Sequence, residues 1–367
     1  MRGDSSGAKN YQPRVIDTFL QESLAASGAV WLQGPKWCGK TWTARQIARS
    51  SLMMQDPDES ANYLQQAMVK PSLLLNGDTP RLIDEWQMAP VLWDAVRFAV
   101  DQRGEMGQFI LTGSTMPLRK ETMHSGTGRI SRIKMRTMSL YESKESTGQV
   151  SLARLFNQDE PEGTAQLSIE GLAYAIARGG WPASIGLSDK AALSQAGQYL
   201  TAIVENDVFE LSDVHRNPRR IMLLMRSLAR NIATIASVET LRKDVSGSES
   251  ELAVSTVNAY LDILKRLYVV ENQPAWSTRL RSKAYLPKSP KRHFTDPSIA
   301  VAALQTNPDG FCTTSTPLAT CLNLCVSEIC VSTHITLAEK FAIIVMKPAW
   351  KLMRSLPCLM GDGALLK

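Results

Sequence analysis

Residues 30–41 read Val-Trp-Leu-Gln-Gly-Pro-Lys-Trp-Cys-Gly-Lys-Thr. A short apolar run leads into Gly-x-x-x-x-Gly-Lys-Thr, and residues 42–48 are compatible with a helix. Strand, glycine-rich loop and helix in this order form the P-loop pattern. Its glycines let backbone N–H groups turn inward around phosphate oxygens, and the positive end of the helix dipole points at the anion. The alternative is a chance match in an ordinary loop. The residues expected to bind phosphate are Gly34, Pro35, Lys36, Trp37, Cys38, Gly39, Lys40 and Thr41.

A second stretch, residues 80–87, reads Pro-Arg-Leu-Ile-Asp-Glu-Trp-Gln, an apolar strand that ends in two carboxylates. We expect Lys40 to reach the β- and γ-phosphates of a nucleotide and the Thr41 hydroxyl to bind Mg²⁺. Asp84 would hold the same Mg²⁺ through water, and Glu85 would orient and deprotonate the attacking water. Two adjacent acids at the end of a strand are also compatible with a solvated turn.

A third strand, residues 108–114, ends near Thr112 and Ser114, either of which could sense the γ-phosphate. The flexible sequence Gly-Thr-Gly then places Arg129 after a loop. Arg129 is a candidate arginine finger, acting on its own nucleotide or on that of a neighbouring subunit, which leaves a homo-oligomer open. An ordinary surface arginine is the alternative.

These motifs together resemble one family, the bacterial and archaeal AAA-type ATPases fused to a C-terminal domain of uncharacterised function. The similar segments, covering roughly residues 14–306, are GPKWCGKT, PRLIDEWQ, FILTGST, GRISRIKMRTMSLYES, GGWPASI and SPKRHFTDPSIAVAAL. The resemblance implies ATP and Mg²⁺ as ligands and hydrolysis as the activity. It also implies a final domain with a restriction-endonuclease-like fold, beginning near residue 294.

Composition is that of a soluble globular chain of two or three domains, with 44% hydrophobic and 21% charged residues. The sequence contains no apolar run of about 18 residues, so we expect no membrane span. The first residues lack the apolar core of a signal peptide, which predicts a cytoplasmic protein. The net charge of +6 mildly favours an anionic partner, although the nucleotide alone accounts for part of it.

The order of elements predicts an α/β fold. Strands over 29–33, 81–84 and 109–112 alternate with helices, which is typical of a three-layer P-loop NTPase with a parallel sheet. The nucleotide should lie at the carboxyl ends of the strands. The predicted segments are a flexible arm (1–13), the AAA-type ATPase domain (14–142), a linker (143–168), a helical, winged-helix-like domain (169–285), the start of a nuclease-like α/β domain (286–310) and a tail (311–367).

Residues 217–285 follow the winged-helix order of three helices and a hairpin, the hairpin formed by 268–270 with 283–286. Residues 272–295 contain no acid and several arginines and lysines with interleaved aromatic residues. That composition fits contact with a nucleic-acid backbone, whereas a solvated basic loop is the alternative. Many winged helices only bind proteins, so the region 217–292 predicts either a DNA or a protein partner.

The tail differs from the rest of the chain. Of six cysteines, Cys38 lies in the P-loop, and the other five are Cys312, Cys321, Cys325, Cys330 and Cys358. The family resemblance stops near residue 310, and a shifted reading frame permits strings similar to the family's C-terminal domain, including its E-A-D strand. We therefore hypothesise a frameshift near residues 307–311 and assign the tail cysteines no metal or disulfide role. A divergent natural tail is the alternative.

The sequence thus predicts an ATPase coupled to a winged-helix-like module. The alternative from another class is a nucleotide-gated DNA- or protein-binding module with little turnover. A switch of that kind needs no strong base, so Glu85 distinguishes the two hypotheses. A defective product of a damaged gene is a third hypothesis.

Overall fold

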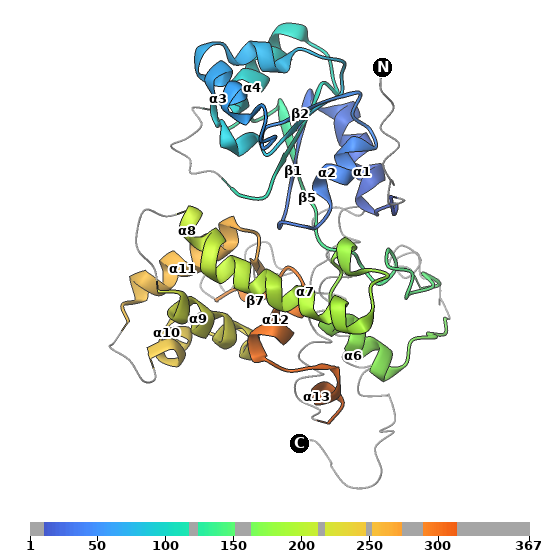
Figure 1. Cartoon of the computed structure of the whole chain (residues 1–367), viewed down its shortest axis with the longest axis vertical. Coiled ribbons are helices and arrows are strands. Elements are labelled where there is room, and N and C mark those ends of the chain that lie inside the picture. Colours follow the sequence, from blue (N-terminus) through green and yellow to red (C-terminus); the bar gives the residue numbers. More distant parts are fainter. Residues whose placement is uncertain are drawn as a thin grey trace, which may run out of the picture.

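The computed structural model describes residues 11–116, 124–150, 163–211, 217–246, 252–273 and 289–313. They form an N-terminal α/β domain and a second, mainly helical domain that lies against one edge of its sheet (Figure 1). The first domain comprises α1 (Ile16–Ala26), β1 (Ala29–Gln33), α2 (Lys40–Arg45), β2 (Ser50–Met53), α3 (Ser60–Val69), η1 (Pro71–Leu75), β3 (Arg81–Asp84), η2 (Trp86–Met88), α4 (Val91–Arg103), β4 (Phe109–Gly113) and β5 (Ile130–Lys134).

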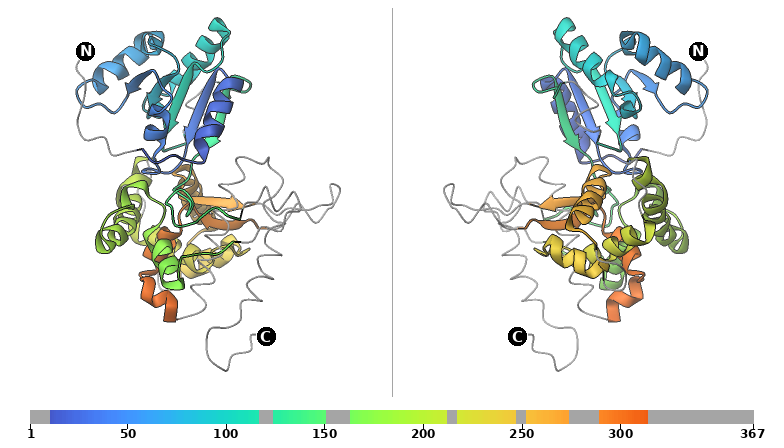
Figure 2. Two further views of the ribbon diagram at one scale, coloured as in Figure 1. Left: turned by 90° about the vertical axis from the view of Figure 1, so that its right-hand side faces the viewer. Right: turned by 90° about the vertical axis from the view of Figure 1, so that its left-hand side faces the viewer.

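The sheet of the first domain is parallel throughout and has the strand order β2-β3-β4-β1-β5. Strand β4 therefore lies between β1, which leads into the glycine-rich loop, and β3, which carries the two carboxylates. Parallel strands end at one common edge, so the segments that follow β1, β3 and β4 meet there. In Figure 2 this edge faces the second domain.

Both faces of the sheet are covered, as expected for a parallel sheet. Alternate residues of β1 point to opposite sides: Trp31 packs with α4 and η1, whereas Val30 packs with α1. The predicted three-layer α/β architecture is confirmed for this domain. None of the described helices is long and apolar enough to cross a bilayer.

The second domain is built around one apolar core. Its elements are α6 (Ile169–Arg178), η3 (Pro182–Ser184), α7 (Asp189–Ala202), the π-helical turn η4 (Ile203–Asp207), α8 (Val208–Glu210), α9 (Pro218–Arg230), α10 (Val238–Ser246), α11 (Val254–Arg266), β6 (Val270–Gln273), β7 (Lys291–Phe294), α12 (Pro297–Leu304) and α13 (Pro308–Thr313). Leu224, Leu264 and Ile299 are fully or almost fully buried in this core, so helices distant in sequence form a single unit.

A buried polar cluster joins two of the segments that carry the family resemblance. Asp296 caps α12 by accepting from the backbone N–H of Ser298, and its other carboxylate oxygen accepts from the N–H of Gly180 at 2.9 Å. The Trp181 indole donates to the Ser298 hydroxyl at 3.0 Å. A Cβ added to Gly179 would lie 2.3 Å from Asp296 Oδ1, so the Gly-Gly-Trp turn fits this carboxylate closely. Burial raises the pKa of Asp296.

The hairpin of the second domain differs from the predicted one. Strand β6 pairs antiparallel with β7, with Val270 opposite Phe294 and Glu271 opposite His293. The predicted partner, residues 283–286, lies outside the described residues. The second strand is therefore the segment directly before Asp296, where Phe294 contributes to the core of the domain. The order of three helices followed by a hairpin agrees with the sequence pattern, and the winged-helix assignment stays a prediction.

Side-chain contacts lie within the described parts of two predicted segments, the arm (1–13) and the linker (143–168). The predicted flexible arm ends in an ordered residue, because the Tyr11 hydroxyl donates to Asp17 at 2.6 Å and lies 2.9 Å from the Thr43 hydroxyl. The predicted linker includes Glu145, whose carboxylate accepts hydrogen bonds from both terminal nitrogens of Arg178 on α6. Residues 1–10 and 151–162 lie outside the described part of the chain.

The segment predicted to start a nuclease-like domain, residues 286–310, is packed into the second domain where it is described. Strand β7 completes the hairpin, and α12 contacts α6, α7 and α9. These contacts give no support to a separate domain beginning there. The helix α13 reaches Thr313, and the rest of the tail lies outside the described residues, so the frameshift stays a hypothesis.

Candidate nucleotide-binding site

The carboxyl ends of three neighbouring strands bring the predicted site residues together. In the sheet register Thr112 lies opposite Leu32 on one side and opposite Asp84 on the other. The loop that leaves β1 after Gln33 runs past these positions and enters α2 at Lys40. Residues separated by about 70 positions in the sequence are therefore neighbours because of strand order.

The loop itself has the conformation that its glycines allow. Gly39, the residue before α2, has a φ of 102°, which is strained for residues with a side chain. A Cβ on Gly34 would lie 2.2 Å from the backbone oxygen of Met135, so a larger residue would displace the chain. Trp37 adopts a positive φ of 67° without being glycine, and its side chain is 53% exposed. The loop therefore requires glycine at Gly34 for close backbone approach and at Gly39 for its backbone conformation.

Lys40 is buried, and its ammonium group points back into the loop. Its Nζ donates to the carbonyl oxygens of Gly34, at 3.0 Å, and Pro35, at 2.7 Å. A phosphate in the loop would offer charged acceptors in place of these neutral ones, and charge-assisted hydrogen bonds are the stronger kind. Phosphate binding by Lys40 stays a prediction.

The Asp84 carboxylate is the centre of the polar contacts at the ends of β3 and β4. It is almost fully buried, and its Oδ1 accepts from the hydroxyls of Thr41, at 2.8 Å, and Thr112. Its Oδ2 accepts from the Gln55 amide at 2.6 Å. The sequence did not single out Gln55, because it lies in a stretch, residues 50–79, that carries no recognisable motif.

The Thr41 hydroxyl and the Asp84 carboxylate are suitable oxygen donors for Mg²⁺. Among the described residues no group of three or more His, Cys, Asp or Glu side chains could hold a metal by itself. Mg²⁺ retains several waters and usually takes only one or two protein ligands together with phosphate oxygens, so a hydroxyl and a carboxylate are a suitable pair. Thr41 and Asp84 are therefore the residues that would hold the ion.

Glu85 follows Asp84 in a left-handed backbone conformation, with φ 54° and ψ 43°. This conformation is uncommon for a residue with a side chain and turns Glu85 out of the line of the strand. Its Oε2 accepts from the Ser114 hydroxyl at 3.2 Å and from the Gln87 amide. The structure thus pairs the predicted base with one of the two predicted γ-phosphate sensors, and Asp84 with the other.

Arg129 is the one predicted site residue that lies away from this edge. Its carbonyl oxygen accepts from the N–H of Ala29, the first residue of β1, and its Nε donates to Asp101 near the end of α4 at 2.7 Å. Both contacts are at the amino ends of the parallel strands, opposite the loop. Arg129 is therefore not placed to act on the nucleotide of its own subunit, and action on a neighbouring subunit stays a prediction.

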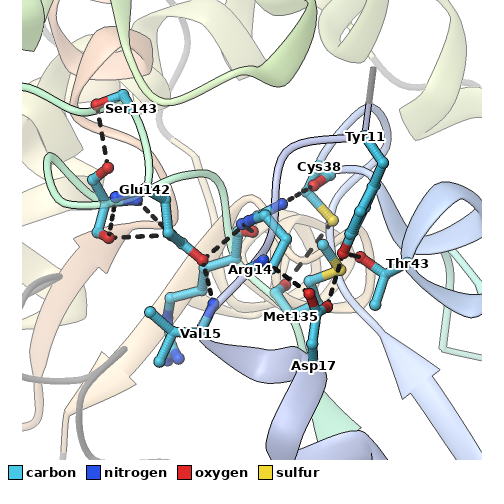
Figure 3. Close-up of polar contacts among 11 residues, drawn as sticks. Tyr11, Arg14, Val15, Asp17, Cys38, Thr43, Met135, Glu142 and Ser143 are labelled. Carbon is cyan, nitrogen blue, oxygen red and sulfur yellow. Dashed lines mark hydrogen bonds and ion pairs between the residues drawn. The ribbon is translucent and has the colours of Figure 1, made fainter. Parts of the chain in front are cut away.

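A buried arginine holds the loop from the N-terminal side, as Figure 3 shows. Arg14 donates through Nη1 to the carbonyl oxygen of Cys38 at 2.8 Å and through Nη2 to that of Arg136 at 2.9 Å. Its Nε pairs with Glu142 at 2.9 Å, and Glu142 also accepts from the N–H of Val15. No motif pointed to Arg14, because its partners lie more than 20 positions away.

The second domain contacts the loop and the strand before it. The Trp37 ring packs against Tyr199 of α7 with centroids 5.5 Å apart. Lys36 Nζ lies 2.7 Å from Asp207 Oδ1 at the end of the π-helical turn. The Tyr268 hydroxyl donates to the Gln33 side chain at 2.8 Å. The side chains of Lys36 and Trp37, two of the predicted loop residues, thus reach toward the second domain.

Comparisons with known proteins agree with the geometry of the first domain. Residues 26–144 match a family model described as an AAA domain, and residues 169–310 match a domain of unknown function (DUF8612). The first region is therefore similar to AAA domains over residues 26–144.

Similar solved structures include the Walker-type ATPase of Pyrococcus abyssi, at 13% identity and a TM-score of 0.46, covering 78% of this chain and 94% of that one. A mutant of RuvB from Thermotoga maritima aligns at 13% identity and a TM-score of 0.26, covering 71% and 87% of the respective chains. Among curated proteins, none matches the sequence.

Proposed function

We propose that the chain hydrolyses ATP in a Mg²⁺-dependent reaction at the carboxyl edge of the N-terminal sheet. The observation that supports this most directly is the pairing of Thr41 with Asp84, with Glu85 next in sequence and turned into a separate set of contacts. The Asp84 carboxylate and the Thr41 hydroxyl would bind the metal, and the Glu85 carboxylate, which has other partners, would act on water. A nucleotide-binding loop without hydrolysis would need only the first pair.

In the proposed reaction Lys40 and the loop N–H groups hold the phosphates, as in other P-loop proteins. Bound Mg²⁺ supplies charge neutralisation on the phosphate oxygens. The Glu85 carboxylate accepts a proton from water as the water oxygen bonds to the γ-phosphorus and the bond to the β-phosphate oxygen breaks. Ser114 and Gln87, which contact Glu85 here, orient that carboxylate.

The test is steady-state release of phosphate from Mg·ATP by the full chain and by the Glu85→Gln variant. We expect kcat to fall by about 10²- to 10⁴-fold, while the affinity for a nonhydrolysable ATP analogue changes little. The control is Glu59→Gln at the exposed start of α3, which should hydrolyse ATP at the parent rate. A Glu85→Gln variant with unchanged kcat would show that Glu85 is not the base.

For the second domain, the features of α11 favour a protein partner over DNA. This is the third helix of the proposed winged-helix order, the one that would enter a major groove. Its exposed positions are Val254, Ser255, Asn258 and Asp262, which lack positive charge, and the cation of the partly exposed Lys265 is paired with Asp262. Arg292, counted in the basic segment, is buried and donates to the carbonyl oxygen of Ala236 at 2.6 Å.

Most of the rest of that segment, residues 274–288, lies outside the described residues. Fluorescence anisotropy with duplex DNA tests this preference. We expect weak binding that is lost at moderate salt, whereas tight, sequence-dependent binding would favour the DNA alternative.

A further inference from the structure

Lys36 is a cation in the phosphate-binding loop whose charge is already engaged by the second domain. Its Nζ lies 2.7 Å from Asp207 Oδ1 and 3.7 Å from Glu210 Oε2. Both acids belong to the chain segment 203–210, which directly follows α7 and includes α8 (Figure 1). Glu85, the proposed base, is a third carboxylate whose charge acts on Lys36. Lys36 therefore reaches the second domain from a loop in which a nucleotide would place its phosphates.

The segment that holds Lys36 has an unusual backbone. Residues Ile203–Asp207 form a π-helical turn between two α-helical stretches. Such turns are rare, leave a wider and less stable hydrogen-bond pattern, and often occur at functional sites. The Asp207 side chain is only 10% exposed, so its charge depends on a partner. Immediately before this turn, Tyr199 packs on Trp37 of the same loop.

The charge on Lys36 is stabilised in this arrangement. Burial alone would lower the pKa of the Lys36 amine, but Asp207, Glu210 and Glu85 together raise it above its ordinary value. The amine is therefore a full positive charge that lies next to the place where a triphosphate would bring further negative charge. Phosphate and Asp207 would compete for one cation.

We propose that Asp207 and Glu210 hold Lys36 in the nucleotide-free protein and release it to the γ-phosphate when ATP binds, so that segment 203–210 senses the nucleotide. The inference rests on the proposed function, because it needs ATP in the loop. Asp207, left partly buried without its cation, would then move toward water and carry the π-helical turn with it. By reciprocity, anything that strengthens the Lys36–Asp207 pair lowers the affinity for ATP. Asp207 and Glu210 are positioning residues in this account.

The experiment is isothermal titration of the full chain with the Mg²⁺ complexes of a nonhydrolysable ATP analogue and of ADP. Asp207→Asn should raise the affinity for the ATP analogue about 3- to 5-fold, the size expected for a partly exposed ion pair, and should change ADP affinity less. In a Lys36→Gln background the same substitution should have no effect. Asp262→Asn, which removes an exposed pair with Lys265 on α11, is the control.

The titration distinguishes a failure of the proposed function from a failure of the Lys36 proposal alone. If the parent chain binds no ATP analogue, the proposed function and this inference both fail. If the parent binds but Asp207→Asn lowers the affinity, leaves it unchanged or raises it equally without Lys36, only the inference is overturned.

Hydrogen exchange in the unmodified chain gives a second readout that needs no Asp207 variant. The ATP analogue should speed exchange of the amides in 203–210, and it should not do so in Lys36→Gln. Unchanged or slower exchange in the unmodified chain contradicts the proposal.

Discussion

The two domains contribute to the surroundings of the glycine-rich loop in different ways. The N-terminal domain supplies Lys40, Asp84 and Thr112 from the ends of adjacent parallel strands or the helix after them. The second domain supplies Tyr199, Asp207 and Tyr268 from helices and a loop that share no common edge. The first set is fixed by hydrogen-bonded backbone, whereas the second depends on how two surfaces pack. We therefore expect phosphate binding to depend on residues fixed by the sheet, and its control by the second domain to depend on packing between the domains.

We expect the largest loss of ATP affinity from a substitution in the N-terminal domain. Lys40→Ala should weaken ATP binding by about 1000-fold, roughly 4 kcal/mol, because a buried ammonium group that pairs with phosphate is removed. Titration with a fluorescent ATP analogue measures the loss, and Lys70→Ala at the exposed end of α3 is the control. A dissociation constant within tenfold of the parent's would mean that the loop N–H groups, and not Lys40, contribute most of the affinity for phosphate.

The hairpin of the second domain should respond to pH. Burial lowers the pKa of His293 to about 4, and the nearby Glu271 opposes that change. Since the unfolded chain binds the proton near pH 6.5, unfolding takes up a proton between the two values. Stability should therefore fall as the pH drops from about 6.5 to 4, by at most about 3 kcal/mol.

Urea unfolding of the parent and of His293→Gln at a series of pH values measures this effect. The variant should lose most of the pH dependence in that window. An equal loss of stability in both proteins at low pH would show that groups other than His293 cause the pH dependence.

A smaller effect is expected where the metal would be held. Asp84→Asn keeps the shape of the side chain but removes the negative charge of the carboxylate that accepts hydrogen bonds from Thr41 and Thr112. We expect the Mg²⁺ concentration for half-maximal activity to rise about 10- to 100-fold, as for other residues that orient a metal's water ligands. Asp101→Asn, at the opposite edge of the sheet, should leave it unchanged. An Asp84→Asn variant with the parent's Mg²⁺ requirement would exclude Asp84 from the metal site.

The smallest effect is expected between the domains. Tyr268→Phe removes one hydrogen bond, from the Tyr268 hydroxyl to the Gln33 side chain just before the loop. A single hydrogen bond contributes about 1 kcal/mol, so we expect a slightly lower Tm and less than about fivefold change in ATP affinity. Differential scanning calorimetry and ATP titration measure the two quantities. A much larger loss of affinity would show that this contact controls the loop more strongly than Lys36 does.

The motif residues could be predicted because parallel sheets impose a simple rule. Once the loop at 34–41 is recognised, the ends of the other strands must lie beside it, and Asp84, Thr112 and Ser114 follow. Arg129 lies just before β5, a strand that the sequence did not lead us to predict. A residue just before a parallel strand lies at the opposite edge of the sheet from the residues at the strand ends, so Arg129 is far from the loop.

Contacts between helical surfaces could not be predicted in the same way. Asp207 belongs to no recognisable motif, and nothing in the neighbouring sequence indicates that Lys36 is its partner. Arg14 and Gln55 carry no motif, because their partners are reached by packing over long separations. The predicted second strand of the hairpin, residues 283–286, lies outside the described residues, and the order of the chain does not reveal that Lys291–Phe294 pairs with β6.

In the proposed nucleotide-bound state a triphosphate occupies the loop, and its γ-phosphate replaces Asp207 as the partner of Lys36. A crystal structure of the full-length Glu85→Gln variant with ATP and Mg²⁺ tests it most directly. We expect the phosphates within the loop from Gly34 to Thr41, Mg²⁺ beside Thr41 and Asp84, and Lys36 Nζ on a γ-phosphate oxygen instead of Asp207. ATP bound elsewhere, or bound in the loop with the Lys36–Asp207 pair intact, would contradict the account.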